Sequence, residues 1–128
     1  MGPAMRAVAA LTAAIIPFAA VVASRADGDP ARGEQLYADC IACHPVERDV
    51  HGIGPSLAGI VGRKAGEIAG YRYSGPLKRS GLTWTPEALD TFIADPQASV
   101  PANRMPYAGM TNAADRADLI AYLQKISK

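Results

Sequence analysis

The sequence predicts an all-α domain of three to five helices joined by long loops. Three segments pair a helix-starting residue with apolar side chains at helical spacing, and no segment of useful length alternates apolar and polar residues as a strand does. Between residues 46 and 84 the apolar periodicity disappears, while Gly and Pro recur. A loop of this length suits a compact domain when it wraps a large ligand that supplies part of the core.

The first helix is expected to begin at Asp29-Pro30, with Asp29 as the N-cap and Pro30 in the first position. Residues at helical spacing then follow as far as Pro45, which stops the helix: Gly33, Leu36, Tyr37 and Cys40. We expect the following segment, residues 46–84, to be a loop that contains one short helical turn.

Two more helices follow. Thr85-Pro86-Glu87 is a second helix start, and Pro96 ends that helix. A loop around residues 101–109 leads to the last helix, which Asn112 caps. Apolar residues form the buried faces of the two helices: Leu89, Phe92 and Ile93 in one, and Leu119, Ile120, Leu123 and Ile126 in the other.

Residues 1–26 have the layout of a secretory signal peptide. Arg6 precedes an apolar, alanine-rich run over residues 7–23, and small residues lie at its end. An uncleaved membrane anchor is the alternative, although Pro17 interrupts the run and its length is near the lower limit for crossing a bilayer. In both cases we expect residues 27–128 to form one domain in an extracytoplasmic space.

The expected domain is close to neutral. The chain has thirteen Lys and Arg and twelve Asp and Glu, and Arg6 and Arg25 lie in the leader, which leaves eleven basic residues against twelve acidic ones. A nucleic-acid-binding protein needs a concentrated basic face, so this class is excluded. The whole chain has two Phe, one Trp, five Tyr and two Cys, so the domain is poor in large apolar residues and cannot contain several disulfides. It therefore needs another source of stability.

Cys40-Ile41-Ala42-Cys43-His44 is a C-x-x-C-H run, the attachment signal for haem c. Two thiols three residues apart on one helical turn point to the same side, where they can add to the two vinyl groups along one edge of a porphyrin. His44 is then carried under the ring, where it can bind iron. The sequence thus predicts one covalently bound haem c.

Two other kinds of site use the same residues. A C-x-x-C pair also forms plain or redox-active disulfides, but thioredoxin-like proteins place that pair in a βαβ context, which is absent here. A structural zinc ion takes four ligands, and only Cys40, Cys43, His44 and the distant His51 are available.

Four further stretches follow the C-x-x-C-H run in order: residues 54–66, residues 71–74 with 81–84, residues 103–110 and residues 116–123. Together with that run they resemble the haem-binding loops, the methionine loop and the terminal helix of the soluble class I cytochromes c of mitochondria and bacteria. The resemblance spans essentially all of residues 29–126. It implies the small cytochrome c fold, with long loops wrapped around the haem.

By this resemblance, His44 is the proximal iron ligand and the Pro55 carbonyl accepts a hydrogen bond from its other ring nitrogen. The sixth ligand is expected to be a methionine sulfur. Met105 and Met110 are the two methionines after the leader, and Met105 stands at the family's ligand position, so we expect Met105 to bind iron and Met110 to pack in the core.

The resemblance also assigns residues around the haem. Arg63, Tyr73 and Trp84 match residues that hydrogen-bond a haem propionate, and Asn103 is expected to add a further contact. Two groups have structural roles by the same comparison: His51 joins two loops, while Gly33 and Tyr122 lie where the first and last helices cross. The sequence departs from the family at Phe92, where many members carry a tyrosine that reaches the methionine sulfur, and at Leu77, which replaces a polar residue; both indicate a drier pocket.

The resemblance implies a periplasmic one-electron carrier in a respiratory or photosynthetic chain, with no substrate chemistry of its own. An iron with both axial positions filled has no place for a small-molecule substrate. The expected partners are redox proteins, namely a quinol–cytochrome c reductase, a terminal oxidase, a dehydrogenase or a photosynthetic reaction centre, and a monomer is expected. The alternatives are a fixed electron-transfer subunit of an oxidoreductase complex and a haem peroxidase or gas sensor.

Overall fold

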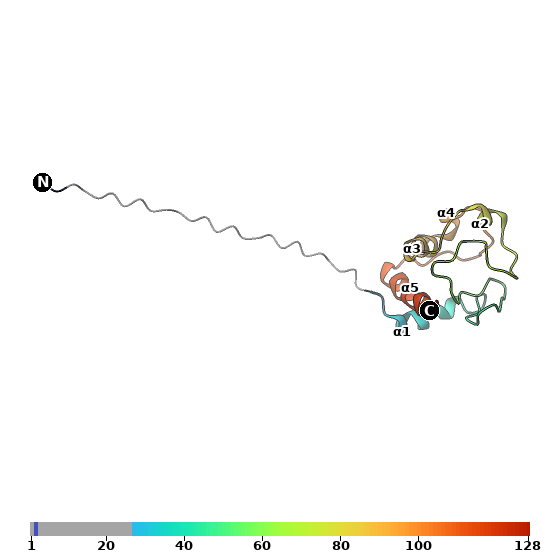
Figure 1. Cartoon of the computed structure of the whole chain (residues 1–128), viewed down its shortest axis with the longest axis horizontal. Helices are drawn as coiled ribbons and strands as arrows, with labels where there is room; N and C mark the ends of the chain where they lie inside the picture. The colour runs from blue at the N-terminus through green and yellow to red at the C-terminus, as the bar shows by residue number, and fades with distance from the viewer. Residues whose placement is uncertain (1, 3–26) are drawn as a thin grey trace.

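The computed structural model describes residues 27–128, together with Gly2, and this part of the chain is helical with long loops (Figure 1). Its elements in order are α1 (Pro30–Leu36), a 3₁₀ turn (Tyr37–Asp39), α2 (Gly75–Arg79), α3 (Pro86–Ala94), α4 (Pro96–Ser99) and α5 (Ala113–Lys125). Within residues 27–128 there is no β-strand, and one isolated bridge pairs Lys64 with Thr83. The predicted all-α class is confirmed. The leader expected over residues 1–26 lies outside the described residues.

The first helix starts where the sequence predicts but ends earlier. The Asp29 carboxylate accepts a 2.8 Å hydrogen bond from the Ala31 amide, and Pro30 fills the first position. The prediction of one helix up to Pro45 is wrong, because α1 ends at Leu36 and a 3₁₀ turn follows. From Tyr37 onward the backbone closes tighter turns, with the Cys40 amide bonded to the Tyr37 carbonyl at 2.8 Å.

The remaining helices begin at capping residues. The Thr85 hydroxyl accepts from the Ala88 amide at the start of α3, and the Asn112 side chain accepts from the Asp115 amide at the start of α5. Helix α2 is the short turn expected within residues 46–84. Helix α4 was not predicted, yet Asp95-Pro96 repeats the pattern of Asp29-Pro30, and the Asp95 carboxylate caps the Ala98 amide at 3.0 Å.

Helices α1 and α5 cross closely, as Figure 1 shows near the C-terminus. Gly33 makes the crossing possible, because a Cβ there would overlap the backbone of Asp118 and the Cβ of Tyr122. Arg32 bridges the two helices through Asp118 at 2.6 Å and Asp115 at 2.7 Å. The expected roles of Gly33 and Tyr122 are confirmed.

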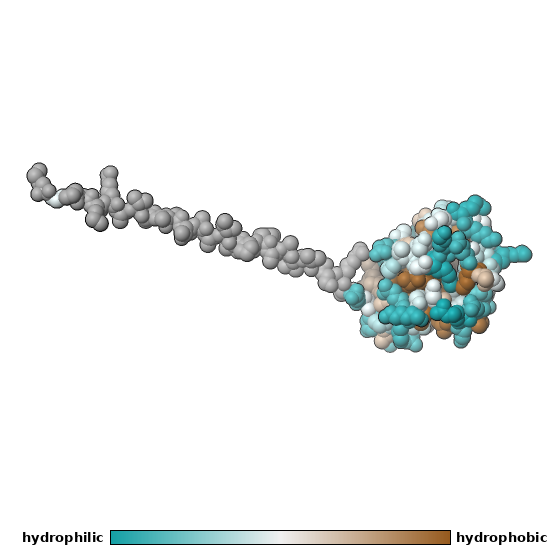
Figure 2. Space-filling model, in the orientation of Figure 1, coloured by the Kyte–Doolittle hydropathy of each residue, from teal (hydrophilic) through white to brown (hydrophobic). Residues whose placement is uncertain are grey.

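The core lies between these crossed helices and the segment from Trp84 to Met110. Its buried residues, all less than a tenth exposed, include Tyr37, Ile60, Trp84, Leu89, Phe92, Val100, Met110, Leu119, Ile120, Tyr122 and Leu123. The surface seen in Figure 2 is mostly hydrophilic, with hydrophobic residues visible between. No helix within the part of the chain that is described is both long and apolar enough to cross a membrane.

Backbone hydrogen bonds between residues 62–65 and residues 82–84 close the base of the loop that precedes α3. The Gly62 amide bonds to the Trp84 carbonyl and the Trp84 amide to the Arg63 carbonyl, both at 2.9 Å, and the Ala65 amide bonds to the Leu82 carbonyl at 2.8 Å. These bonds hold the two ends of the segment together, so the loop between them can follow the wall of a cavity with no secondary structure other than the short helix α2.

Candidate cofactor site

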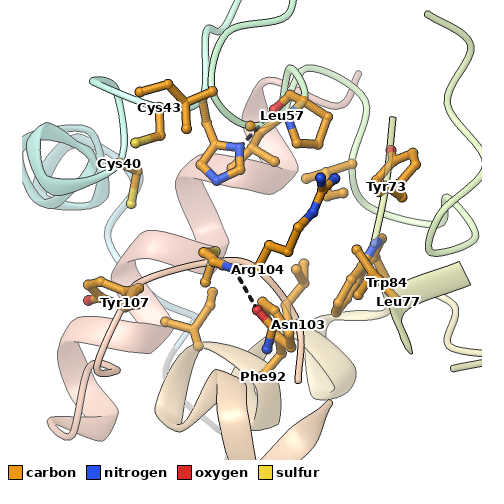
Figure 3. Close-up of a pocket in the computed structure, with 18 of the residues that line it drawn as sticks. Cys40, Cys43, Leu57, Tyr73, Leu77, Trp84, Phe92, Asn103, Arg104 and Tyr107 are labelled. Carbon is orange, nitrogen blue, oxygen red and sulfur yellow. Dashed lines mark hydrogen bonds between the residues drawn. The ribbon is translucent and has the colours of Figure 1, made fainter. Parts of the chain in front are cut away.

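A cavity of about 620 Å³ lies inside the ring of loops and helices, and Figure 3 shows many of the residues that line it. This volume is within the range of pockets that hold small molecules and cofactors. All nine residues that the sequence analysis assigned to the site line this one cavity: Cys40, Cys43, His44, Pro55, Arg63, Tyr73, Trp84, Asn103 and Met105. Residues far apart in the chain thus meet around one space.

The imidazole of His44 is fixed from two sides. Its Nδ1 lies 2.8 Å from the Pro55 carbonyl oxygen, which can only accept, so the ring hydrogen is on Nδ1 and the Nε2 lone pair is free. Gly54 lies against the ring face, where a Cβ would overlap the imidazole. Burial is the main cause that lowers the pKa of His44, which keeps the ring neutral and able to bind a metal.

Cys40 and Cys43 lie on one turn at the edge of the cavity (Figure 3). The Cys43 and His44 amides both bond to the Cys40 carbonyl, at 3.0 and 2.9 Å, so the two cysteines and the histidine belong to one compact unit. The two cysteines are not joined to each other by a disulfide. Burial raises the pKa of the Cys40 thiol to about 11, the opposite of what a redox-active thiol needs.

A zinc site has no support in this arrangement. Among residues 27–128 no three His, Cys, Asp or Glu side chains are grouped closely enough to hold a metal ion. His51 is instead engaged elsewhere, with Nδ1 accepting from the Ser56 amide and Nε2 facing the Ala69 carbonyl, both at 3.0 Å. The two nitrogens join the segment around residue 56 to the loop around residue 69, the loop-joining role expected of His51.

The two methionines differ in position. Met105 is half-buried and lines the cavity, whereas Met110 is 9% exposed and packs in the hydrophobic core. The Met110 amide bonds to the Ile93 carbonyl at 2.8 Å, which ties that residue to α3. Of the pair, Met105 is the one whose thioether can reach a ligand in the cavity.

Arg63 carries a buried donor without a partner. Its Nη2 donates to the Ser56 carbonyl at 3.0 Å, but Nε is buried and unpaired among the residues that the structure describes. Burial also lowers the pKa of this guanidinium. A buried charge with a free donor calls for an anionic partner. Tyr73 and Trp84 line the same cavity and are both less than a tenth exposed, so a carboxylate entering it would meet a cation and aromatic side chains with polar hydrogens.

Asn103 lines the cavity, and its side chain is also bonded to three backbone groups. Its side-chain amide nitrogen donates to the carbonyls of Pro96 and Val100 at 2.8 and 2.9 Å, which uses both hydrogens, and its Oδ1 accepts from the Met105 amide at 2.8 Å. The side chain of Asn103 thus holds the backbone at Met105, through the bond that the dashed line at Asn103 marks in Figure 3.

Sequence reasoning missed three residues that shape the site. Tyr37 lines the cavity, and its hydroxyl donates to the His44 carbonyl. Gly54 leaves room for the imidazole of His44. Arg104 donates to the Arg72 carbonyl and so joins the methionine loop to the loop that contains residue 72. Of the three, only Gly54 could have been recognised from the sequence, because it directly precedes Pro55. The contacts of Tyr37 and Arg104 join segments that only the fold brings together.

Comparison with known proteins decides the family. The Cytochrome c family model matches residues 30–127. The chain is 48% identical to cytochrome c2 iso-2 of Magnetospirillum fulvum over 101 residues, which cover 79% of this chain and all of that protein. It is 40% identical to cytochrome c2 of Blastochloris viridis over 111 residues, 86% of this chain and 87% of that one. The chain belongs to the cytochrome c family.

A solved structure agrees with this assignment. Cytochrome cH from Methylobacterium extorquens superposes with a TM-score of 0.73 at 44% identity, over 77% of this chain and 99% of that one. The cytochrome c fold predicted from sequence is thus confirmed, and the C-x-x-C-H cysteines of this family member, Cys40 and Cys43, attach one haem c covalently. The protein is a single-haem electron-transfer protein and not an enzyme.

Proposed function

We propose that this cytochrome c carries one electron at a time on a haem iron held between His44 and Met105. One observation carries the proposal: a single cavity brings together an imidazole whose Nε2 lone pair is free and a methionine whose neighbours fix its backbone. The haem supplies a metal centre that accepts and releases a single electron.

The two side chains have different effects on the bound iron. The hydrogen bond from His44 Nδ1 to the Pro55 carbonyl increases the basicity of Nε2 and fixes the plane of the ring. The soft thioether of Met105 favours the ferrous state and so raises the reduction potential. With His44 and Met105 both bound to it, the iron would offer no open site to oxygen, peroxide or other small molecules, which suits a carrier.

Arg63, Tyr73 and Trp84 are proposed to hold a haem propionate. The support is the buried, unpaired Nε of Arg63 on the cavity wall, together with the two buried aromatic side chains beside it. Placing the negative charge here satisfies that donor and offsets the cost of burying a guanidinium. Asn103, which lines the same cavity, is proposed to lie against the haem while its side-chain oxygen positions the Met105 backbone.

We place the protein in the periplasm, as a monomer that exchanges electrons with membrane or periplasmic redox proteins. The signal-peptide pattern over residues 1–26 supports the location. Candidate donors are a quinol–cytochrome c reductase or a dehydrogenase, and candidate acceptors are a terminal oxidase or a photosynthetic reaction centre. Salt dependence of reduction and oxidation rates with each partner would identify the physiological pair. Co-purification at fixed stoichiometry with one complex would instead indicate a bound subunit.

The ligand assignment is tested by a matched pair of variants, Met105→Leu and Met110→Leu, both of which keep the volume of the side chain nearly unchanged. We expect Met105→Leu to lose the far-red charge-transfer band of ferric iron bound by methionine and to bind carbon monoxide rapidly when reduced. Met110→Leu should keep the band and exclude carbon monoxide. Loss of the band in Met110→Leu alone would overturn the assignment, and rapid carbon monoxide binding by the unaltered protein would end the carrier proposal.

A further inference from the structure

One peptide group, between Pro55 and Ser56, lies between the two histidines of the domain. Its carbonyl oxygen is 2.8 Å from Nδ1 of His44, and its amide nitrogen is 3.0 Å from Nδ1 of His51. Because a peptide carbonyl only accepts and a peptide amide only donates, His44 carries its hydrogen on Nδ1 whereas His51 presents a bare Nδ1. The three groups therefore form one directed chain of hydrogen bonds, from imidazole to peptide to imidazole.

The second nitrogen of His51 completes the arrangement. Nε2 lies 3.0 Å from the Ala69 carbonyl, which requires a hydrogen on Nε2 and gives the neutral ring a single tautomer. The ring of Tyr71 meets that of His51 edge-on at a centroid distance of 6.0 Å, and the Tyr71 hydroxyl donates to the Ile53 carbonyl at 2.7 Å. His51 thus has two separable contacts, an acceptor contact with Ser56 and a loop-joining contact with Ala69.

The acceptor contact is in a position to act on His44. Peptide resonance couples the amide and the carbonyl of one planar unit, so an amide that donates a hydrogen bond leaves more electron density on the carbonyl oxygen. Ser56 is fully buried, at 0% exposure, so water does not compete for its amide. A stronger carbonyl acceptor draws the Nδ1 hydrogen of His44 more strongly and makes Nε2 a better electron donor.

We propose that His51 is a positioning residue for His44, which it influences through the Pro55–Ser56 peptide group, and that this contact lowers the midpoint potential of the protein. The proposal rests on the proposed function, in which His44 is an iron ligand. A more strongly donating imidazole favours ferric iron, so loss of the acceptor at Nδ1 of His51 raises the potential. This role is additional to joining two loops.

Two substitutions separate the two contacts of His51. The side-chain oxygen of His51→Asn lies near the place of Nδ1, so it keeps an acceptor for the Ser56 amide and loses the contact with Ala69. The side-chain amide of His51→Gln reaches the place of Nε2, so it keeps a donor for Ala69 and loses the acceptor for Ser56. Both variants are made in the full chain, matured with haem, and studied at pH 8.

The measurements are the midpoint potential, the melting temperature and the NMR signal of the His44 Nδ1 hydrogen in the reduced protein. We expect His51→Gln to raise the midpoint potential and to move the His44 Nδ1 hydrogen signal upfield. We expect His51→Asn to lower the melting temperature, with much smaller changes in the midpoint potential and in the His44 signal. Potentials that shift equally in the two variants, or that follow melting temperature, would show that His51 only joins loops.

A measurement on the unaltered protein keeps the test independent of how the variants fold. In a ¹⁵N-labelled sample we expect a scalar coupling across the hydrogen bond between the Ser56 amide nitrogen and Nδ1 of His51; its absence would overturn the proposal. Failure of the proposed function looks different: if His44 is not a ligand, the coupling and the shift of the His44 signal in His51→Gln remain, while the potential stays unchanged.

Discussion

The hydroxyl of Tyr37 donates a 2.6 Å hydrogen bond to the backbone carbonyl of His44. Tyr37 is only 3% exposed, and its ring packs against that of Tyr122 of α5 at a centroid distance of 5.3 Å, with the two ring planes tilted by 55°. Burial raises the pKa of this phenol, which stays protonated and keeps its role as donor. The crossing of α1 and α5 is therefore connected directly to the backbone of the residue that faces the cavity.

Replacing Tyr37 by Phe should remove this bond while keeping the contact between the rings of residues 37 and 122. A part-buried carbonyl then loses its partner, so we expect the free energy of unfolding of the holoprotein to fall by about 1 kcal/mol. Urea denaturation followed by far-UV circular dichroism measures the change. Tyr122→Phe, which alters the other ring of the pair, is the control, and an equal loss in both variants would contradict a specific role for the bond to His44.

Gly54→Ala should displace the imidazole of His44. A Cβ at Gly54 would overlap the ring, and the bond to Pro55 prevents the ring from simply moving aside. Overpacking of this kind costs about 1–3 kcal/mol, and we expect less haem per chain and a weakened far-red band.

Gly52→Ala is the matched control for this variant, because a Cβ there comes no closer than 3.1 Å to the Cys43 carbonyl oxygen and 3.4 Å to the Pro45 ring. Normal haem content in Gly54→Ala would show that the ring has more freedom than the geometry implies.

Phe92→Tyr should raise the midpoint potential. Phe92 lines the cavity, is 9% exposed and meets the Trp84 ring edge-on at 5.0 Å between centroids. A hydroxyl that donates to the Met105 sulfur reduces electron donation to the iron, which favours the ferrous state. Redox titration measures the potential, with Phe92→Leu as the control for altered packing. An unchanged potential in Phe92→Tyr would mean that the hydroxyl does not reach the sulfur.

Asp118→Asn should reduce stability at neutral pH and have little effect in acid. The Asp118 carboxylate accepts from the Asp29 amide at 2.7 Å and from Arg32 at 2.6 Å, and these contacts, the Asp29 amide first, hold its pKa below the ordinary value. A carboxyl whose pKa is lower in the folded state stabilises the protein above its unfolded pKa of about 3.9, and this contribution disappears as the pH falls through the folded value.

The measurement for Asp118 is the difference in melting temperature between the unaltered protein and the variant, recorded from pH 7 down to pH 2. We expect a positive difference at pH 7 that narrows once the pH falls below about 4. A difference that stays constant across this range would assign the effect to packing between α1 and α5 rather than to charge.

The helix starts and the residues of the site could be predicted because their signals are local. Asp29-Pro30, Thr85-Pro86 and Asn112 are capping patterns that act within one turn, and each marks a helix start in the structure. The C-x-x-C-H run is equally local. All nine assigned site residues line one cavity. Their assignment to one site came from the resemblance to cytochromes c, because the spacing of residues along the chain does not show which distant segments meet.

The missed features depend on contacts between distant segments. Helix α1 ends at Leu36, and tight turns follow it as far as His44. The Tyr37 hydroxyl donates to the His44 carbonyl at the end of these turns. The role of Asn103 depends on three backbone partners that only the folded methionine loop brings within reach. Neither follows from periodicity or from residue type, because both require knowledge of which carbonyl lies beside which side chain.

The backbone hydrogen bonds between residues 62–65 and residues 82–84 should determine how fast amide hydrogens of this loop exchange with solvent. Because the bonds joining Gly62, Arg63 and Ala65 to Trp84 and Leu82 close the loop at its base, residues within the loop can open together while the base stays intact. Exchange protection should therefore fall into two levels, with the amides of Gly62, Ala65 and Trp84 slow and those of the enclosed segment faster and similar to one another. Local opening of the loop between residues 65 and 82 would then expose one side of the cavity to solvent without unfolding α1 and α5.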